Sequence, residues 1–291
     1  MIRSGDIFFS VVIPTYERPS DLKVCLDALS LERQIESPKY EIIVSDDSQS
    51  LSSKELIDNN FPHVIWVKGK QIGPAGNRNK GVEYACGEWI VFLDDDCIPD
   101  NQYLKKYADA IYENPNISVF EGRIFPNRRR STWAEGCPEN EMGGMLWTSN
   151  LCVKKKLYNS MGGLDESFKV AYEDVDFSYR LKQKGISVRF VYEASVCHPW
   201  RTLKKEGKNW KRSGYEIESL KIFLKKHGIN EITDPILHLR YLCRMLTRDQ
   251  LTSVIEFRGR GYAILINQIF TTIQSIFIIL MFKYRKCGRQ K

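Results

Sequence analysis

The chain has 291 residues, of which 43% are hydrophobic and 12% aromatic, so it can bury a substantial core and is not a disordered segment. The formal net charge of +7, from 43 basic and 36 acidic residues, is compatible with anionic nucleotides, phospholipid surfaces or nucleic acid and does not choose among them. The eight cysteines include no CxxC pair, which argues against a zinc knuckle and favours reduced thiols in a cytosolic protein. Residues 1–6 are polar and offer no signal-peptide core, so the catalytic part is expected to stay in the cytoplasm.

The first hundred residues alternate apolar runs with segments of helical spacing. The runs predict strands and the segments between them predict helices: strands at 7–13 (stopped by Pro14), 40–44, 63–67 and 89–93, and helices at 20–31, from 51, and at 75–85. This alternation predicts βαβ units with right-handed crossovers. The expected fold class is therefore α/β, with a doubly wound, mostly parallel sheet.

Beyond residue 100 the pattern is looser. It predicts helices at 101–112 and 173–184, strands at 117–125, 146–153 and 187–192, and helix from 204 onward. The polar, Gly-containing stretch 127–144 is typical of a mobile loop. We therefore expect a catalytic domain at 1–202 and a helical C-terminal region at 203–291.

The segment 262–282 carries no charged residue and is long enough to cross a bilayer, which takes roughly 20 residues. Its polar side chains Asn267, Thr271, Gln274 and Ser275 fall on one helical side, which also fits a helix lying in the membrane interface. A buried helix docked on the core is the third reading. We expect the chain to associate with the cytoplasmic face of a membrane through this region, and flanking basic residues on both sides give no orientation.

Three consecutive carboxylates, Asp94, Asp95 and Asp96, follow the apolar run at 89–93. Because a buried strand cannot end inside the core in three carboxylates, they must emerge at its C-terminal end, where open α/β sheets bind ligands. Clustered carboxylates repel one another unless a cation compensates, and a hard divalent metal bridging to phosphate oxygens is the usual resolution. The alternative is a solvated turn or a helix cap, since Asp favours both.

Two further clusters follow predicted strands. Thr15 comes after the first strand, and Asp46 and Asp47 come after the second, where a carboxylate can accept a hydrogen bond from a nucleobase or a ribose. The Gly-marked segment 73–81 opens a helix, which suits phosphate, and its Arg78 offers a fork for phosphate oxygens. Turn chemistry explains the first cluster equally well, and an ordinary helix entry explains the second.

A third cluster combines the glycine-containing segment 162–166 with the acidic start of a predicted helix. Glu173 is explained by the preference of acidic residues for a helix N-terminus. Asp174, on the first turn, can serve as a general base if it lies near a bound donor. Asp176 and Arg180 are spaced i, i+4 and are expected to form a structural ion pair.

One histidine, His198, lies between a predicted strand end and a Pro-Trp turn. Neutral imidazole is a common metal ligand. A lone histidine is more often a satisfied structural residue, so the pattern around His198 leaves both readings open.

Seven motifs occur in a fixed order along residues 8–202: VVIPTYER (11–18), VSDDS (44–48), GPAGNRNKG (73–81), FLDDDCIPD (92–100), GGLDESF (162–168), YEDVDFSYRLKQKG (172–185) and VCHPW (196–200). Each motif is weak by itself, and the seven in order are specific. Together they resemble the family-two inverting nucleotide-sugar glycosyltransferases. The resemblance implies the Rossmann-like A-type glycosyltransferase fold, here with a helical C-terminal extension.

The resemblance also implies roles for the matching positions. It implies that Asp96 and His198 are ligands of a Mg²⁺ or Mn²⁺ ion and that Asp174 is the general base. Contacts to the donor nucleotide are implied for six further residues: Thr15, Asp46, Asp47, Arg78, Asp94 and Asp95.

The implied reaction takes a sugar from a nucleoside-diphosphate donor. A base removes a proton from an acceptor hydroxyl, whose oxygen attacks the anomeric carbon opposite the nucleotide, so configuration inverts. The implied partners are this donor and a glycan or lipid-linked acceptor, with a membrane surface if 262–282 binds one, and no nucleic acid. Trp147 and Asn150 are candidates for the acceptor side, and loop 127–144 could close over the donor.

Two alternatives remain at this point. A metal-dependent sugar nucleotidyltransferase would also place an Asp-bound metal on a doubly wound sheet, but it would not need the GGLDESF and YEDVDF motifs. A non-enzymatic, basic membrane-surface protein would use the acidic clusters only as caps, and it would bind no nucleotide in a metal-dependent manner.

Overall fold

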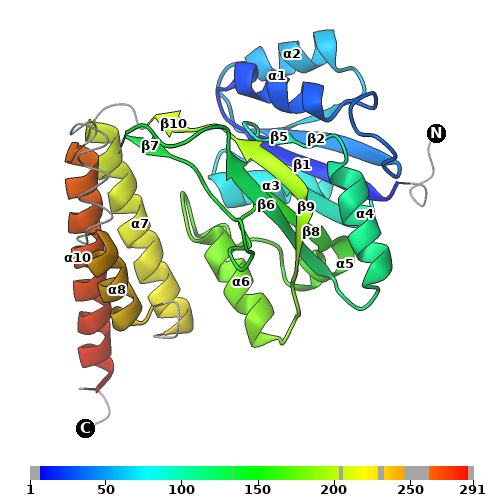
Figure 1. Ribbon diagram of the computed structural model, residues 1–291. Coiled ribbons are helices and arrows are strands. Elements are labelled where there is room, and N and C mark those ends of the chain that lie inside the picture. Colours follow the sequence, from blue (N-terminus) through cyan, green and yellow to red (C-terminus); the bar gives the residue numbers. More distant parts are fainter. Residues whose placement is uncertain (1–6, 133, 203–205, 229–232, 246–261, 288–291) are drawn as a thin grey trace. The chain divides into compact units, whose positions relative to one another are not determined.

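The computed structural model describes residues 7–132, 134–202, 206–228, 233–245 and 262–287 (Figure 1). The chain forms two compact units. The first comprises Met1–Asn127, Cys137–Glu166 and Glu173–Pro199, and the second comprises Arg128–Gly136, Ser167–Tyr172 and Trp200–Lys291. The predicted division at residue 202 into a catalytic domain and a C-terminal region stays a prediction.

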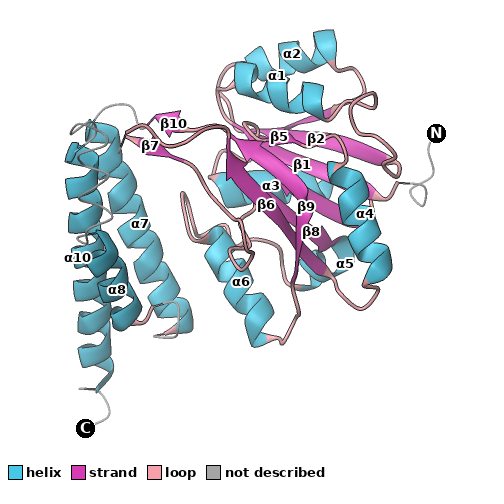
Figure 2. Cartoon of the chain, viewed as in Figure 1, coloured by secondary structure: helices cyan, strands magenta, loops and turns pink. Residues whose placement is uncertain are grey.

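An eight-stranded sheet organises the first unit, in the order β3-β2-β1-β4-β8-β6-β9-β5 (Figure 2). Its strands are β1 (Phe9–Thr15), β2 (Tyr40–Asp46), β3 (Ile65–Lys68), β4 (Trp89–Leu93), β5 (Ile98–Pro99), β6 (Val119–Pro126), β8 (Asn150–Lys154) and β9 (Arg189–His198). Strands β3, β2, β1 and β4 are parallel neighbours, as are β6 and β9. Strand β8 runs antiparallel between β4 and β6, and β5 runs antiparallel to β9. The predicted α/β fold with a mostly parallel sheet is confirmed.

Helices cover both faces of this sheet: α1 (Pro19–Ala28), α2 (Ser52–Asn60), α3 (Pro74–Glu83), α4 (Tyr103–Glu113), α5 (Lys155–Ser160) and α6 (Glu173–Gln183). The alternation along β1 shows the two layers. Val11 packs in a cluster with residues of α1, α2 and α4, and Val12 packs in another with residues of α3, α5 and α6. Because both faces are covered, the central strands read as continuous apolar runs.

Pro14 does not stop the first strand, which continues to Thr15. Proline removes a backbone donor, so it is normally excluded from central strands. Here the pairing of β1 with β4 ends at Val12, while β2 still accompanies β1 to its last residue. The proline therefore lies where the ladder on the β4 side has already ended, and the prediction was wrong for that reason.

Two strands of the second half differ from the predicted ranges. Strand β8 begins at Asn150 rather than at 146, since Leu146 has a left-handed backbone (φ 47°) that a strand cannot contain. Strand β9 runs on to His198 because residues 195–198 pair with β6 beyond a register shift at Gly122. This extension brings His198 to the strand end.

The second unit is mainly helical, with α7 (Glu206–His227), α8 (Pro235–Met245) and α10 (Tyr262–Cys287). It also holds the small pairing of β7 (Glu135–Gly136) with β10 (Arg201–Thr202). Helix α10 packs on α7 and on α8. By length and composition alone, this helix could cross a membrane.

Candidate active site

The C-terminal ends of parallel strands meet at one edge of the sheet and bring the predicted acidic residues together. Strand β1 ends at Thr15, which stands in register with Asp46 at the end of β2. The hydroxyl of Thr15 donates to Oδ2 of Asp95, just beyond β4, at 2.7 Å. Strands β1, β2 and β4 thus deliver a hydroxyl and several carboxylates to the edge where open α/β sheets bind ligands.

Asp95 is held by two side chains of the first loop. Besides the Thr15 hydroxyl, Arg18 contacts it, with Nη2 at 2.7 Å from Oδ1. Burial raises the pKa of Asp95 to about 7, although the charge of Arg18 acts to lower it. The sequence did not single out Arg18, whose Nη1 also lies 3.7 Å from Asp96. Its position three residues past Thr15 in the motif VVIPTYER was the available signal.

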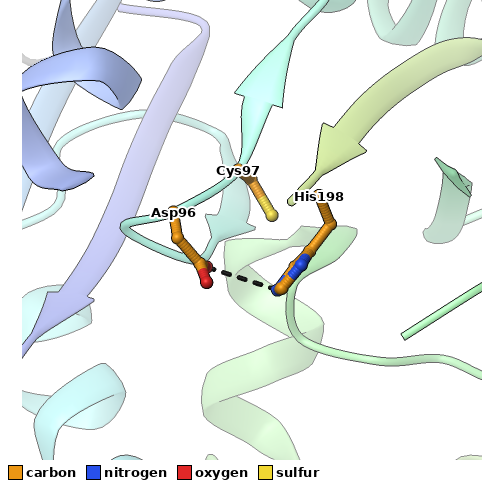
Figure 3. Close-up of side chains that lie close together, drawn as sticks. All are labelled: Asp96, Cys97 and His198. Carbon is orange, nitrogen blue, oxygen red and sulfur yellow. Dashed lines mark ion pairs between the residues drawn. The ribbon is translucent and has the colours of Figure 1, made fainter. Parts of the chain in front are cut away.

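Asp96 and His198 come from distant parts of the chain and face one another (Figure 3). Nε2 of His198 lies 3.3 Å from Oδ1 of Asp96, and both side chains are buried. Nδ1 of His198 lies 2.8 Å from the carbonyl oxygen of Pro199. Because that carbonyl can only accept, Nδ1 carries a proton and Nε2 is the nitrogen directed at the carboxylate.

Cys97 completes a group whose ligand atoms all lie within 4.8 Å of one another (Figure 3). Burial, with the nearby carboxylates, raises the pKa of its thiol well above the ordinary value, and the thiol donates to the carbonyl oxygen of Ser149 at 3.7 Å. A protonated thiol is a poor ligand for a hard cation. The carboxylate of Asp96 and the imidazole of His198 fit a divalent cation, and the imidazole suits Mn²⁺ better than Mg²⁺.

Arg78, near the start of α3, bridges two carboxylates. Its Nη2 donates to Oδ1 of Asp94 at 2.6 Å, and its Nη1 donates to Oε1 of Glu173 at 3.3 Å. Burial acts to lower the pKa of Arg78, but Asp94, Glu173 and Asp174 raise it, so the guanidinium stays charged. Both Nη groups of its guanidinium thus bind carboxylates, so they do not face a phosphate site. Its buried Nε has no hydrogen-bond acceptor within the described part of the chain.

Glu173 is more than an N-terminal helix residue. Its side chain is buried against Arg78, and burial together with the neighbouring Asp174 raises its pKa. The prediction that explained Glu173 by the preference of acidic residues for a helix N-terminus was therefore incomplete. Burial and a partner 95 positions away cannot be read from a local pattern.

Asp174 lies on the first turn of α6, beside this bridge. Burial raises the pKa of its carboxyl group, while Arg78 acts to lower it. The backbone N–H of Val175 donates to its Oδ1 at 2.8 Å. Its neighbour Glu173 shares the guanidinium of Arg78 with Asp94, so Asp174 directly follows a residue that is bridged to the acidic end of β4.

One loop fixes the two helices that carry these groups. Asn79 of α3 accepts from the backbone N–H of Leu164 at 3.0 Å and donates to its carbonyl at 2.8 Å. Arg180 of α6 donates to the carbonyls of Met161 and Gly163, each at 2.7 Å. The predicted ion pair of Arg180 with Asp176 is also present, at 2.7 Å. The loop thereby sets the position of Arg78 relative to Glu173.

Asp46 and Asp47 both make hydrogen bonds within the protein. Asp46 is fully buried and accepts from the backbone of Ser48 at 2.8 Å and from the indole of Trp66 at 3.1 Å. Asp47 accepts from the backbone of Gln71 at 2.9 Å. Burial raises the pKa of Asp47. Both residues shape the loops at the sheet edge, and their contact with a nucleotide stays a prediction.

The suggestion that Asn150 faces an acceptor was wrong. Its side chain is buried, and its carboxamide accepts from the hydroxyls of Tyr103 at 2.9 Å and Tyr107 at 2.6 Å. It donates to the carbonyls of Arg123 at 2.9 Å and Ala194 at 3.0 Å. A fully satisfied amide at the bulge in β6 is a structural residue. Trp147 packs against the core and is partly buried.

The end of the stretch predicted as a mobile loop is anchored by a residue that the sequence did not reveal. Glu121 of β6 is buried, and its carboxylate accepts from the backbone N–H groups of Gly144, Met145 and Leu146. The side chain of Asn140 donates to it at 3.1 Å. The segment leading to β8 is therefore tied to the sheet.

We expect Glu121→Ala to lower the free energy of unfolding by about 3 kcal/mol, because it leaves two buried donors, the backbone N–H of Leu146 and the side-chain amide of Asn140, without this acceptor. Urea denaturation followed by circular dichroism measures this value. Glu141→Ala is the matched control, since that exposed glutamate pairs with Arg123 at the surface and its loss should cost no more than about 1 kcal/mol. Equal losses for the two variants would contradict the anchoring role.

Comparisons with known proteins agree with this arrangement. Glycosyltransferase AglE of Haloferax volcanii is 26% identical over 208 residues, which cover 67% of this chain and 67% of that protein. Chondroitin synthase of Escherichia coli is 24% identical over 236 residues, covering 65% of this chain and 34% of that protein. A GalNAc(5)-diNAcBac-PP-undecaprenol beta-1,3-glucosyltransferase of Campylobacter jejuni is 37% identical over 93 residues, or 30% of this chain and 29% of that protein. The chain therefore spans 67% or less of the length of each of these relatives.

Among solved structures, residues 1–349 of TarS from S. aureus superimpose with a TM-score of 0.58 at 18% sequence identity, covering 93% of this chain and 81% of that one. The same TarS fragment in complex with UDP-GlcNAc gives a TM-score of 0.57 at 17% identity, covering 75% of this chain and 67% of that one. At this identity the likeness shows the fold, which is the A-type glycosyltransferase fold.

Two family models match the sequence. The one described as glycosyl transferase family group 2 matches residues 89–283, and the one described as glycosyl transferase family 2 matches residues 10–160. The second match begins in β1 and includes all the strand ends from Thr15 to Asp96 that build the acidic edge of the sheet. The chain thus belongs to glycosyl transferase family 2.

Proposed function

We propose that this glycosyltransferase moves a sugar from a nucleoside-diphosphate donor to an acceptor hydroxyl with inversion, in the synthesis of a surface glycan or polysaccharide. The observation that carries the proposal is that polar residues from distant parts of the chain meet just past the end of β4. Asp94 binds the guanidinium of Arg78, which also acts on Asp174 of α6. Asp96 lies against His198. The relatives named above support the donor class and the glycan product, since they are glycosyltransferases or glycan synthases by name.

In this proposal Asp174 is the general base. Burial raises its pKa, which makes it a better proton acceptor than an exposed carboxylate, while the charge of Arg78 favours the ionised form. The acceptor hydroxyl gives its proton to Asp174 as the oxygen forms the new bond to the anomeric carbon and the diphosphate leaves. The hydrogen bonds that Asn79 and Arg180 make to the loop before α6 keep this helix in place during the transfer.

The donor would lie along the ends of β1, β2 and β4. Thr15, Asp46 and Asp47 would line the part of the sheet edge that binds the nucleobase and ribose. Asp94 and Asp95 would line the part that binds the diphosphate. Asp96 and His198 would hold a Mn²⁺ or Mg²⁺ ion, whose charge would stabilise the leaving diphosphate. Arg78 orders Asp94 and Glu173, and it is available for phosphate only if one of these contacts opens.

We assign catalysis to residues 1–202 and attachment to the cytoplasmic face of a membrane to residues 203–291. The apolar helix α10 supports the attachment, and the undecaprenol-linked substrate in the name of one relative supports a lipid-linked acceptor. No relative reported above is a nucleotidyltransferase. The non-enzymatic alternative has no support from the family match.

A panel of nucleoside-diphosphate sugars tests the proposal. We expect slow release of nucleoside diphosphate from at least one of them, dependent on Mn²⁺ or Mg²⁺ and abolished by EDTA. With an acceptor supplied, nuclear magnetic resonance should show a product anomer opposite to that of the donor. Release of pyrophosphate from a nucleoside triphosphate and a sugar phosphate would instead support the nucleotidyltransferase.

A further inference from the structure

Helix α10 exposes a continuous apolar stripe. Seven large side chains along it are more than a third exposed: Ile266, Phe270, Ile273, Phe277, Leu280, Met281 and Tyr284. Their spacing of three, four and seven residues places them on one side of the helix. From the first to the last, the stripe is about 27 Å long at the rise of an α-helix. A stripe of this size exceeds the scattered apolar residues of an ordinary soluble surface.

The opposite side of α10 is packed inside the second unit. Ile279 is fully buried in a cluster with Leu220 and Leu224 of α7. Asn267 is also buried, and its side chain donates to the hydroxyl of Ser213 on α7 at 3.0 Å. One face of helix α10 therefore packs against protein, and the opposite, apolar face is suited to a second apolar environment.

This two-faced packing argues against a helix that crosses the bilayer. A crossing helix meets lipid on all sides unless other spanning helices cover it, and Asn267 would then lose Ser213 to hydrocarbon. Its neighbour α7 cannot accompany it, because α7 carries exposed charges such as the pair Glu218 and Lys221. A helix that lies in the membrane plane keeps α7 on the aqueous side and immerses only the stripe.

The basic amino-acid sequence in and on either side of α10 favours an anionic surface as its partner. The sequence after Glu256 contains no acidic residue, whereas it contains seven basic ones: Arg258, Arg260, Lys283, Arg285, Lys286, Arg289 and Lys291. Basic residues beside a membrane surface are attracted by anionic phospholipid head groups. Tyr284, 76% exposed, ends the stripe next to Lys283, where an amphipathic ring suits the head-group level. A second copy of the chain would bring an equal positive charge instead of a complementary one.

We propose that the α10 stripe binds in the plane of an anionic phospholipid membrane, with α7 facing the water. Helix α8, which packs on α10, also exposes Ile236, Leu239 and Arg240. This inference refines the membrane attachment in the proposed function and rests on it. It predicts that attachment is peripheral, salt-sensitive and selective for anionic lipid.

Flotation of the full chain with liposomes tests the inference. We expect binding to vesicles of phosphatidylcholine mixed with anionic phosphatidylglycerol, and little binding to pure phosphatidylcholine. Phe277→Glu, on the stripe, should weaken partition about tenfold or more because it removes an immersed ring and adds a negative charge. Gln274→Glu is the matched control, since it adds the same charge at an exposed position beside the stripe and should weaken binding by no more than about fivefold, the effect of one charge near the surface.

Three results would overturn the inference. Equal effects of the two substitutions would show that the stripe does not enter the lipid. Resistance of the bound protein to alkaline carbonate would show a spanning helix. Loss of a stable dimer in Phe277→Glu, with no flotation of the wild type, would show that a second copy covers the stripe. Metal-dependent donor turnover, measured on the same preparations, reports on the proposed enzymatic function separately, because neither variant touches the candidate active site.

Discussion

Replacing Asp174 by asparagine should lower kcat for sugar transfer by about 10²–10⁴-fold, because the variant cannot accept the proton of the acceptor hydroxyl. Binding of the nucleoside diphosphate should stay within about threefold of the wild type, since the lost interaction acts in the transition state. Initial-rate kinetics and calorimetric titration separate the two effects, with UDP as the probe because the structurally similar TarS fragment has been solved in complex with UDP-GlcNAc. Asp21→Asn, an exposed first-turn aspartate of α1, is the matched control and should behave as the wild type.

The same substitution has a predicted sign for stability. Burial raises the pKa of Asp174 in the folded chain above its value in the unfolded chain, so the folded state favours the protonated form. The stability associated with that proton is fully present below the unfolded pKa and is lost as the pH rises through the folded one. Asp174→Asn, which is always neutral, should therefore be at least as stable as the wild type at neutral pH.

Activity should follow the opposite trend with pH. The base must be ionised, so kcat should fall as the pH drops, with a midpoint above about 4, the ordinary value of an aspartate. A transfer-competent Asp174→Asn variant, or a midpoint at the ordinary aspartate value, would argue against the assignment of the base.

Replacing Asp96 or His198 by alanine is the second change with a large expected effect. Each variant should bind Mn²⁺ about 100-fold or more weakly in the presence of UDP, because each removes one of two protein ligands. Electron paramagnetic resonance of free Mn²⁺ measures this without any need for turnover. Transfer should fall in parallel, and added Mn²⁺ should restore part of it.

Cys97→Ala is the control for this site. The thiol is buried, and its raised pKa keeps it protonated, so its removal should change Mn²⁺ binding by less than about threefold. A loss as large as that of His198→Ala would mean that the three clustered side chains act as one ligand set. Unchanged binding in both Asp96→Ala and His198→Ala would place the ion elsewhere.

Local patterns predicted the first half of the fold well. The runs that became β1 to β4 are apolar because both faces of the sheet are covered, and the helices between them carry the matching periodicity. The antiparallel insertion of β8 between β4 and β6 is different, since it pairs Leu93 with Asn150 across a long intervening stretch. No local pattern records which strand edge a later strand will join.

The candidate site shows the same division. Asp96, His198 and Asp174 could be predicted as site residues because they stand at strand and helix ends within motifs that occur in order. Arg18 and Glu173 were missed as site residues because their importance comes from burial and from partners far along the chain. Asn150 was misassigned for the converse reason, since a polar residue near the site was already satisfied by buried tyrosines.

The central claim is that Asp96 and His198 bind one divalent ion at the strand end that Asp174 faces. Anomalous X-ray scattering from crystals grown with Mn²⁺ and UDP tests it most directly. We predict a single strong manganese peak within coordination distance of the Asp96 carboxylate and Nε2 of His198, with the diphosphate bound to the ion. A peak at Asp46 and Asp47 instead, or UDP bound with no metal between Asp96 and His198, would contradict it.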